Sequence, residues 1–361
     1  MIAFDVVPAT LSEPIANDSF PLPVAIAEKV IGMPRIKIGQ IGTGHAHASG
    51  KMDVYRKSDD FEVVGVVEPD EKLKRQAERQ ATYRDLPWMT VEQLLNVPGL
   101  QAVAVETEPR QLLGYAEACV DAGKHVHLDK PAGESLLQFR RILDTTARKH
   151  LCLQMGYMYR YNPAVVLMKD LLRKGFLGDP FEVHCVMSKV VDPANRLRHA
   201  EYAGGMMFEL ACHVIDVVVD LLGPPEAVTP YHQHIGNQAD SLRDNMLAVL
   251  TYPRALATVK STAMEVEGFS RRHIVLCGTE GTIHIEPLDS PKTVRVALAK
   301  EHGKYKKGYQ DVTVPGYERY VGDAADFAKV IRGEKMFDWS PMHDLAVQET
   351  VLRASACPTD R

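Results

Sequence analysis

Several features of membrane, secreted and nucleic-acid-binding proteins are scarce in this chain. Its six cysteines stand far apart with no Cys-x-x-Cys pair, so their spacing predicts neither a zinc cluster nor a disulfide framework. No apolar run approaches the roughly 20 residues needed to cross a bilayer. The 42 basic and 47 acidic residues give a net charge of -5, which leaves no basic excess for nucleic acid. We therefore expect a cytoplasmic protein that acts on a small molecule, with neither nucleic acid nor a membrane as partner.

The first 34 residues differ from the rest of the 361-residue chain, which is long enough for two domains. Residues 1–34 hold five prolines and show little periodicity, which predicts an N-terminal extension that is disordered or loosely docked. This segment has no basic stretch before an apolar one, so it is not a recognisable export signal. Met33 directly precedes the first ordered pattern, and we hypothesise that it is the physiological start.

A strand, a glycine turn, a helix and a second strand follow one another from residue 36. The apolar run 36–41 leads at once into Gly42-Thr43-Gly44, and a helical stretch begins near His45. A second apolar run, 61–67, ends at Glu68. Glycines in such a turn let the backbone approach a pyrophosphate, and the acidic residue binds the adenosine ribose. The pattern predicts a dinucleotide-binding domain with cofactor contacts at Gly42, Thr43, Gly44, His45 and Glu68.

The acidic residue at the end of the second strand favours NAD over NADP. Glu68 is followed by Pro69, so no basic side chain is at hand for a 2′-phosphate, which the carboxylate would also repel. The glycine pattern is incomplete, because His47 stands where Gly-x-Gly-x-x-Gly has its third glycine. A purely structural turn is the alternative for Gly-x-Gly alone, and the two flanking strands favour the cofactor.

Strands and helices continue to alternate as far as residue 156. The segments with strand or helix patterns are 101–107, 112–122, 124–128, 136–149 and 151–155. Their alternation predicts a parallel sheet covered on both faces, with ligands bound beyond the carboxyl ends of the strands. We expect Thr107, Asp129 and Lys130, which stand at two of these ends, to contact the cofactor.

An α+β pattern replaces the strict alternation after residue 156. Helical stretches mix with strand-like runs, glycines at 278 and 281 predict a hairpin, and residues 320–356 predict two helices with a break at Pro341. We expect residues 35–156 to form a Rossmann NAD-binding domain and residues 157–361 a second domain for substrate binding and oligomerisation. Antiparallel sheets often keep one face open, which suits the interface of a homodimer or homotetramer.

Four polar side chains share one face of an apolar helix predicted over residues 204–220. Glu209, His213, Asp216 and Asp220 fall within about 60° of one another on a 3.6-residue helix. A helix this apolar is buried, so its polar stripe faces a partner or a cavity. A His with a carboxylate one turn before it is suited to proton transfer. The alternative is a set of structural hydrogen bonds, which we favour for Asp216 and Asp220 as ties to the scaffold.

Together these motifs resemble the Gfo/Idh/MocA oxidoreductases, a family that includes glucose–fructose oxidoreductase and inositol dehydrogenase. The resemblance extends from about residue 36 to the C-terminus. The matching segments are Gly39-Gln-Ile-Gly42-Thr-Gly44, Ala122-Gly-Lys-His-Val-His-Leu-Asp129-Lys130-Pro131, Gly156-Tyr-Met-Tyr-Arg160-Tyr-Asn-Pro163, and Gly204-Gly205 with Glu209-x-x-x-His213. The family implies a Rossmann domain followed by an α+β domain with a large, open, mostly antiparallel sheet. It also implies hydride transfer, in carbohydrate metabolism, between NAD and a secondary hydroxyl of a sugar, polyol or sugar derivative.

The resemblance assigns catalytic roles to three side chains. Lys130 would contact the nicotinamide ribose and the substrate hydroxyl, and its bond to Pro131 is often cis in the family. His213 would accept the hydroxyl proton. Glu209 would bind a neighbouring hydroxyl or orient His213.

Three residues depart from the family pattern. Asp129 replaces a Glu, which we expect to be benign. Glu209 replaces an Asp, so its carboxylate reaches one methylene further and changes where the substrate hydroxyls lie. His47 replaces a small residue, which either alters the packing of the first helix or places an imidazole near the pyrophosphate.

Other polar groups are expected to line the same cleft. We expect the substrate to contact Tyr157, Arg160, Asn162, Lys189 and Glu209. Three His-x-His pairs, at 45/47, 125/127 and 232/234, invite a metal interpretation. No carboxylate close to them in sequence completes a ligand set, so we expect no metal.

Three classes of function compete. The first is an NAD-dependent dehydrogenase. The second is a redox-neutral glycoside hydrolase or lyase in which tightly bound NAD transiently oxidises the sugar. The third is a non-catalytic NAD-binding regulator, against which Lys130 and His213 count. Production of NADH in bulk solution separates the first class from the second.

Overall fold

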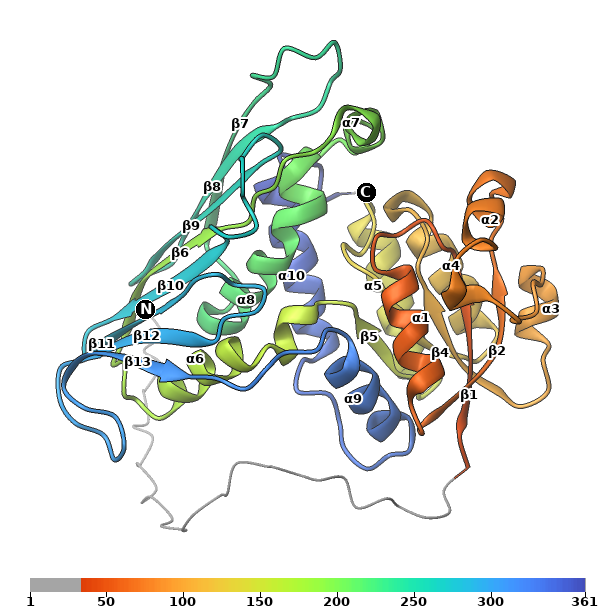
Figure 1. Ribbon diagram of the computed structural model, residues 1–361, viewed down its shortest axis with the longest axis horizontal. Coiled ribbons are helices and arrows are strands. Elements are labelled where there is room, and N and C mark those ends of the chain that lie inside the picture. Colours follow the sequence, from red (N-terminus) through yellow and green to blue (C-terminus); the bar gives the residue numbers. More distant parts are fainter. Residues whose placement is uncertain (1–33, 361) are drawn as a thin grey trace, which may run out of the picture. The chain divides into compact units, whose positions relative to one another are not determined.

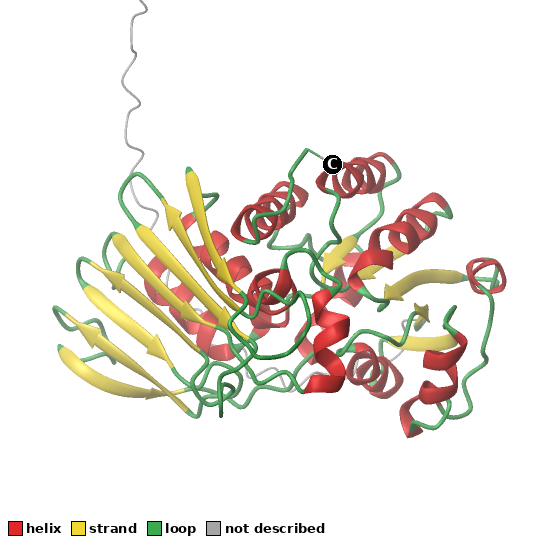
Figure 2. Ribbon diagram, turned by 90° about the horizontal axis from the view of Figure 1, so that it is seen from above, coloured by secondary structure: helices red, strands yellow, loops and turns green. Residues whose placement is uncertain are grey.

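A computed structural model describes residues 34–360 of the chain (Figure 1). The predicted N-terminal extension and its hypothesised start at Met33 lie outside these residues, apart from Pro34. Two sheets, one parallel and one mostly antiparallel, hold all the named strands of the described part, with helices between them (Figure 2). No helix in residues 34–360 is long and apolar enough to cross a membrane.

Five parallel strands form the first sheet, in the order β2-β1-β3-β4-β5. Alternate residues point to opposite faces, so Val103 and Val105 join one hydrophobic cluster while Ala102 and Ala104 join another. Helices α4 and α5 cover the first of these faces and α1 covers the second, which confirms the predicted α/β architecture. The elements are β1 Ile36–Ile41, α1 Ala48–Lys57, β2 Phe61–Val67, α2 Glu71–Ala77, α3 Val91–Leu95, β3 Leu100–Val105, α4 Pro109–Asp121, β4 His125–Leu128, α5 Leu136–Arg148 and β5 Leu153–Met155.

Helix α9, Val321–Ile331, packs back on this first sheet although it comes near the end of the chain. Its residues Ala324 and Phe327 join the cluster that contains Ile36 and Phe61. The rings of Phe327 and Phe61 are stacked, with centroids 6.4 Å apart. The expected boundary between two domains at residue 156 stays a prediction, because this late helix belongs to the core of the first one.

Eight strands form the second sheet, in the order β13-β12-β11-β10-β6-β9-β8-β7. Neighbouring strands are antiparallel except β6 and β9, and β10 and β11 make the predicted hairpin. Burial alternates along the strands, so one face packs on helices and the other stays partly exposed. A homodimer or homotetramer formed through the exposed face stays a prediction. The strands are β6 Pro180–Val186, β7 Ala227–Gln233, β8 Asn245–Thr251, β9 Leu256–Thr262, β10 His273–Gly278, β11 Gly281–Ile285, β12 Thr293–Leu298 and β13 Gly308–Thr313.

Helices α8 and α10 lie between the two sheets (Figures 1 and 2). Helix α8, Cys212–Leu222, contacts β6 and β9, while α10, Pro341–Ala354, contacts α8, α5 and β7. Pro341 is the first residue of α10, where the side chain of Ser340 accepts a hydrogen bond from the backbone of His343. The two predicted C-terminal helices and the break between them are thus confirmed. The remaining helices are α6 Pro163–Arg173 and α7 Pro193–Ala200.

The helix predicted over residues 204–220 is not uniform. A π-helical turn spans Met207–Ala211, and α8 begins only at Cys212. A π turn closes i to i+5 hydrogen bonds, so Glu209 stands outside the 3.6-residue spacing on which the predicted polar stripe relied. The uniform helix was therefore wrong at its N-terminal end. Such turns often occur at functional sites.

Candidate active site

The glycine turn after β1 has a shape that only glycine allows. Gly42 has a φ of 93°, and its N–H donates to the carbonyl oxygen of Val67 at 2.7 Å. A Cβ at this position would lie 2.5 Å from the backbone nitrogen of Thr107, which stands at the end of β3. The turn therefore leaves bare backbone at the carboxyl ends of β1 and β3, where a pyrophosphate binds in folds of this kind.

The acidic residue predicted to bind ribose stands beside this turn. One oxygen of Glu68 accepts hydrogen bonds from the Thr43 backbone N–H at 2.5 Å and from its hydroxyl at 2.8 Å. The other oxygen accepts from the backbone of Asp70 at 3.0 Å. Bare glycine backbone with a fixed carboxylate alongside fits a dinucleotide, and the individual contacts with NAD stay predictions.

Arg198 on α7 reaches across to the glycine turn, a contact that sequence reasoning did not find. Its guanidinium donates to the carbonyl oxygen of Gly44 at 2.5 Å and pairs with Glu108 at 2.5 Å. The hydroxyl of Tyr202 also donates to Glu108. The second domain thereby holds the outer side of the turn, and no local pattern near residue 198 signals a partner 154 residues away.

Replacing Arg198 with Ala is expected to raise the Kd for NAD about ten-fold, because a charge-assisted hydrogen bond of about 1.5 kcal/mol no longer fixes the turn. Titration of NAD by calorimetry measures the effect. Arg110→Ala is the matched control, since Arg110 forms an exposed pair with Glu201 at 3.4 Å and lies 5.9 Å from the ring centroid of Tyr202, while Arg198 bonds the turn itself. Equal Kd values for the two variants would contradict the role of Arg198.

Asp129, at the end of β4, lies at the centre of a buried ionic cluster. Its carboxylate is 2.9 Å from Nδ1 of His45, 3.2 Å from Nδ1 of His47 and 3.0 Å from Nζ of Lys51. Burial would raise the pKa of Asp129, but His45, Lys51 and His47 hold it well below its usual range. The side chain is fully buried among these protein partners, and the contact of Asp129 with the cofactor stays a prediction.

Two of the departures from the family pattern meet in this cluster. The imidazole of His47, in place of a third glycine, packs against Asp129 and within 5.4 Å of the ring of His213. The two alternatives for His47, altered packing of the first helix or an imidazole near the pyrophosphate, stay predictions. Burial lowers the pKa of His47 to about 3, so its ring is neutral.

Asp129 also corrects the metal argument for the pair His45 and His47. A carboxylate does complete a set of three potential ligands there, although it is distant in sequence. However, the ammonium group of Lys51 lies 3.0 Å from both Asp129 and Glu106, and it already neutralises the buried charge. A cation would have to displace this buried lysine.

His45 lines the cavity described below but uses both ring nitrogens within the protein. Nε2 lies 3.1 Å from the carbonyl oxygen of Lys130, and Nδ1 lies near Asp129. His45 therefore ties the glycine turn to β4. Its contact with the cofactor stays a prediction.

Lys130 follows Asp129 and precedes a cis bond to Pro131, as the resemblance implied. Its side chain is buried, and Nζ donates to the carbonyl oxygen of Glu209 at 2.7 Å, in the π-helical turn. Nζ is also 3.5 Å from the carboxylate of Glu209. Burial would lower the pKa of Lys130, but the Glu209 carboxylate raises it above the ordinary value. Lys130 therefore remains an ammonium group.

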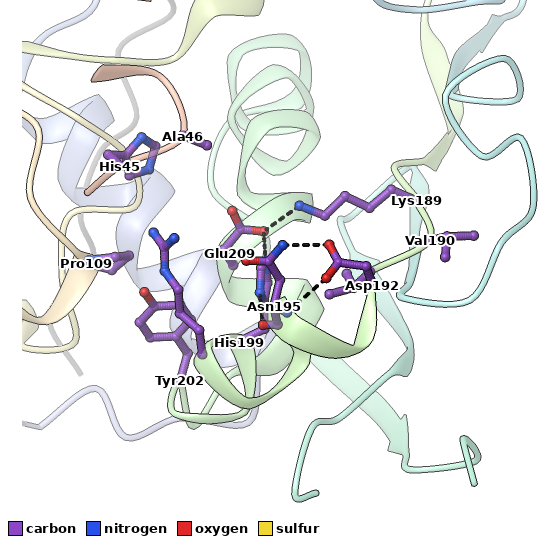
Figure 3. A pocket seen from close by; sticks show the side chains of 12 residues that line it. His45, Ala46, Pro109, Lys189, Val190, Asp192, Asn195, His199, Tyr202 and Glu209 are labelled. Atoms are coloured by element: carbon purple, nitrogen blue, oxygen red, sulfur yellow. Dashed lines mark hydrogen bonds and ion pairs between the residues drawn. The ribbon is translucent and has the colours of Figure 1, made fainter. Parts of the chain in front are cut away.

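Glu209 is the point at which three cationic or basic side chains meet. Its carboxylate is 3.5 Å from Nζ of Lys130. It is also 3.7 Å from Nζ of Lys189 and 3.6 Å from Nε2 of His199 (Figure 3). Burial would raise the pKa of Glu209, but Lys130, Lys189 and His199 hold it well below its usual range. The π turn thus presents an ionised carboxylate together with two ammonium groups.

A cavity of about 190 Å³ lies between the glycine turn and α7 (Figure 3). Glu209 and Lys189 are on its wall, together with His45, His199 and Arg198. Lys130 and His213 are buried and are not among the residues that line it. The cavity places charged and basic groups from both domains around one space.

His213 is the second residue of α8 and follows the π-helical turn that carries Glu209. Its ring is surrounded by those of His47, Tyr157 and Tyr159, with centroid distances of 5.4, 6.2 and 5.5 Å. Among the described residues, Nδ1 of His213 has no hydrogen-bond partner. Burial, then the charge of Lys130, lowers the pKa of His213 well below 6.5. The imidazole is therefore neutral and can accept a proton.

Arg160 is buried among carboxylates, and its predicted contact with the substrate stays a prediction. Its guanidinium bonds both oxygens of Asp216 and one oxygen of Asp344, the latter at 2.6 Å, and only 4% of it is exposed. Asp220 pairs with Lys169 at 2.5 Å. Asp216 and Asp220 thus tie α8 to the scaffold, as expected.

Asn162 caps α6, and its predicted contact with the substrate stays a prediction. Its Oδ1 accepts from the backbone of Ala164 at 2.9 Å, and Nδ2 donates to the carbonyl oxygen of Leu288 at 3.0 Å. Tyr157 packs its ring edge on His213, and its hydroxyl has no hydrogen-bond partner within residues 34–360. The substrate contacts of Tyr157, Lys189 and Glu209 stay predictions.

Two family models match the chain. The model described as "Oxidoreductase family, NAD-binding Rossmann fold" matches residues 36–157, and the "GFO/IDH/MocA C-terminal domain" model matches residues 165–284. Together they cover more than half of the chain. The first match confirms the predicted NAD-binding domain.

Individual proteins are similar along most of the chain. Inositol 2-dehydrogenase 1 of Saccharopolyspora erythraea is 27% identical over 333 residues, which are 88% of this chain and 94% of that protein. Myo-inositol 2-dehydrogenase of Thermotoga maritima is 24% identical over 82% of this chain and 87% of its own length. The solved structure of GenD2 from gentamicin A biosynthesis, in complex with NAD, has a TM-score of 0.74 at 19% identity and covers 90% of this chain and 95% of its own. That last likeness shows a shared fold.

Proposed function

The chain belongs to the Gfo/Idh/MocA family of NAD-binding oxidoreductases, and we propose that it oxidises a secondary hydroxyl of a sugar, polyol or sugar derivative. Two relatives that align over most of its length are named inositol dehydrogenases, which supports a polyhydroxylated substrate. The observation that carries the proposal is that Lys130 and a neutral His213 lie close to Glu209, whose carboxylate is on the wall of the cavity.

NAD is the cofactor of this family's first domain, and the glycine turn fits it. We assign the pyrophosphate to the backbone of residues 42–44 and the adenosine ribose to Glu68, which stands beside Thr43. When bound, NAD supplies the hydride acceptor. The protein must then hold the alcohol carbon and remove the hydroxyl proton.

His213 is the base that we assign to the hydroxyl proton. Its neutral ring can accept a proton, and the nearby ammonium of Lys130 is placed to stabilise the negative charge that develops on the oxygen. The hydrogen bond from Lys130 to the backbone carbonyl oxygen of Glu209 fixes the position of this ammonium, and the carbonyl group carries no net charge. The two groups thus divide proton acceptance and charge stabilisation between them.

Glu209 supplies an ionised acceptor for a second hydroxyl. Its carboxylate stands on the wall of the cavity, where Lys189 and His199 hold it from the other side. A polyol has neighbouring hydroxyls, so the carbon of one can be oxidised while the other donates a hydrogen bond to this carboxylate. The extra methylene of Glu209, relative to the usual Asp, favours a substrate whose second hydroxyl lies further from Lys130.

Activity measurements on the full-length protein test the proposal. The protein is purified without added cofactor, the nucleotide that remains bound is identified, and inositols, sugars and glycosides are screened with NAD⁺ by absorbance and product analysis. We expect NADH to appear in equal amount with a ketone product for at least one polyol or sugar. A converted glycoside with no net NADH would instead show a redox-neutral hydrolase or lyase. Binding of NAD with no turnover of any substrate would favour a regulator.

A further inference from the structure

Three imidazoles lie side by side on the outer face of the large sheet, opposite the face that packs on α8. His184 on β6 and His284 on β11 are both in register with Val275 on the intervening strand β10. His273 lies two residues before Val275 and therefore points to the same face. The ring centroids of His184 and His273 are 5.1 Å apart, and those of His273 and His284 are 5.7 Å apart. The proposed dehydrogenase chemistry uses none of these residues.

Two of these histidines and a neighbouring carboxylate bring potential ligand atoms together. His273, His284 and Glu286 each offer one atom, and the three atoms lie within 4.8 Å of one another. Nε2 of His284 is 2.9 Å from Oε2 of Glu286. The angles of this contact do not make a hydrogen bond, and within the described residues Nε2 of His284 has no other hydrogen-bond partner. The contact therefore leaves a buried ring nitrogen unsatisfied.

The third ligand atom is already oriented. Nδ1 of His273 lies 3.0 Å from the carbonyl oxygen of Arg271. A carbonyl only accepts hydrogen bonds, so Nδ1 carries the proton and Nε2 keeps its lone pair. Metal-binding histidines are commonly fixed in this way, with one ring nitrogen donating to a backbone carbonyl and the other facing the ion.

We propose that His273, His284 and Glu286 form a binding site for a divalent transition-metal ion of the Zn²⁺ class. Two imidazole nitrogens and one carboxylate oxygen suit Zn²⁺, Co²⁺ or Ni²⁺, whereas Mg²⁺ and Ca²⁺ prefer oxygen ligands alone. Ligand atoms about 2.0–2.2 Å from a tetrahedral ion are about 3.3 Å apart, so small side-chain rotations close the site. The fourth position goes to water.

The charged groups around the site leave room for a cation. Arg271, which precedes His273 by two residues, is paired with Glu265. Arg295, in register with His284 on β12, stands 3.9 Å from Asp311. Each arginine thus has a carboxylate partner outside the three proposed ligands, although the charge of Arg271 also acts on Glu286. In the cluster around Asp129, by contrast, a buried lysine already occupies the place of a cation.

Metal binding by tag-free, full-length protein tests this site. The protein is treated with a chelator, dialysed against Zn²⁺ and analysed for bound metal, and its affinity is measured by calorimetry. We expect one Zn²⁺ per chain, and at least a ten-fold loss of affinity in His284→Gln and in Glu286→Gln. His232→Gln is the matched control, because His232 is an exposed histidine on β7 of the same sheet, and this variant keeps the affinity of the wild type.

Thermal unfolding supplies a second readout. Zn²⁺ is expected to raise the Tm of the wild type and of His232→Gln, and to leave the Tm of His284→Gln unchanged, since an ion that binds only the folded state stabilises it. Equal Zn²⁺ affinity in wild type and His284→Gln would overturn the proposal. So would a loss caused by His47→Ala alone, which would place the ion in the buried cluster near the glycine turn.

Discussion

His213→Asn is expected to lower kcat at least about 100-fold with a polyol or sugar substrate of the wild type. Asn has a similar size but cannot accept a proton at neutral pH, so the hydroxyl proton must leave to water. The neutral ring and unpartnered Nδ1 of His213 are the features that suit it to this step. Steady-state kinetics measure kcat, and NAD titration shows whether the first domain still binds its cofactor. A kcat within a few-fold of the wild type would remove His213 from the base role.

The pH profile gives this prediction a second readout. A pKa lowered by burial means that the neutral form of His213 persists as the pH falls past 6.5. The kcat/KM for oxidation should therefore stay level past this point and decline only at a lower pH. The decline should be absent from His213→Asn. An acidic limb centred at 6.5 or above would contradict the environment described for this ring.

Lys130→Met is expected to lower kcat at least about 100-fold, because the substrate oxygen loses the ammonium that stabilises its developing charge. Met keeps much of the length and volume of the side chain, which is buried. The loss should fall on kcat, since the interaction strengthens as the alkoxide forms. Single-turnover measurement of NADH formation separates this chemical step from product release.

Lys189→Met is the matched control for Lys130→Met. Both lysines lie near the carboxylate of Glu209, at 3.7 and 3.5 Å, but only Lys189 is on the cavity wall. We expect Lys189→Met to raise KM and to change kcat less than ten-fold. Equal effects of the two variants on kcat would mean that the charge of Glu209, rather than contact with the substrate oxygen, controls the rate.

The first domain could be predicted because its signals are local. Gly42 and Glu68 lie at the ends of short apolar strands, and a strand, turn and helix are encoded by neighbouring residues. Lys130 could be placed at the cleft for the same reason, since it directly follows β4. The antiparallel sheet, the use of NAD and the family were predicted from a set of motifs whose order along the chain is specific.

Long-range partners could not be predicted in the same way. Arg160 comes just after the last strand of the first sheet, where a substrate contact is expected. Only the fold shows that its guanidinium pairs with Asp216 and Asp344. The sequence likewise did not show that His45 and His47 lie beside the carboxylate of Asp129, because 82 residues separate His47 from it. The π turn at Glu209 is equally invisible, because an apolar segment with helical composition does not state how many residues each turn holds.

The return of α9 to the first sheet makes the NAD-binding half of the molecule discontinuous in sequence. A fragment that stops at residue 156 would leave Ile36 and Phe61 without Ala324 and Phe327, and would expose apolar surface. Any truncation or exchange of the segment after residue 156 in this chain must therefore leave α9 with the first sheet. Because α10 follows α9 and packs against both α5 and α8, the chain crosses between the two halves more than once, and neither half is a single continuous segment of sequence.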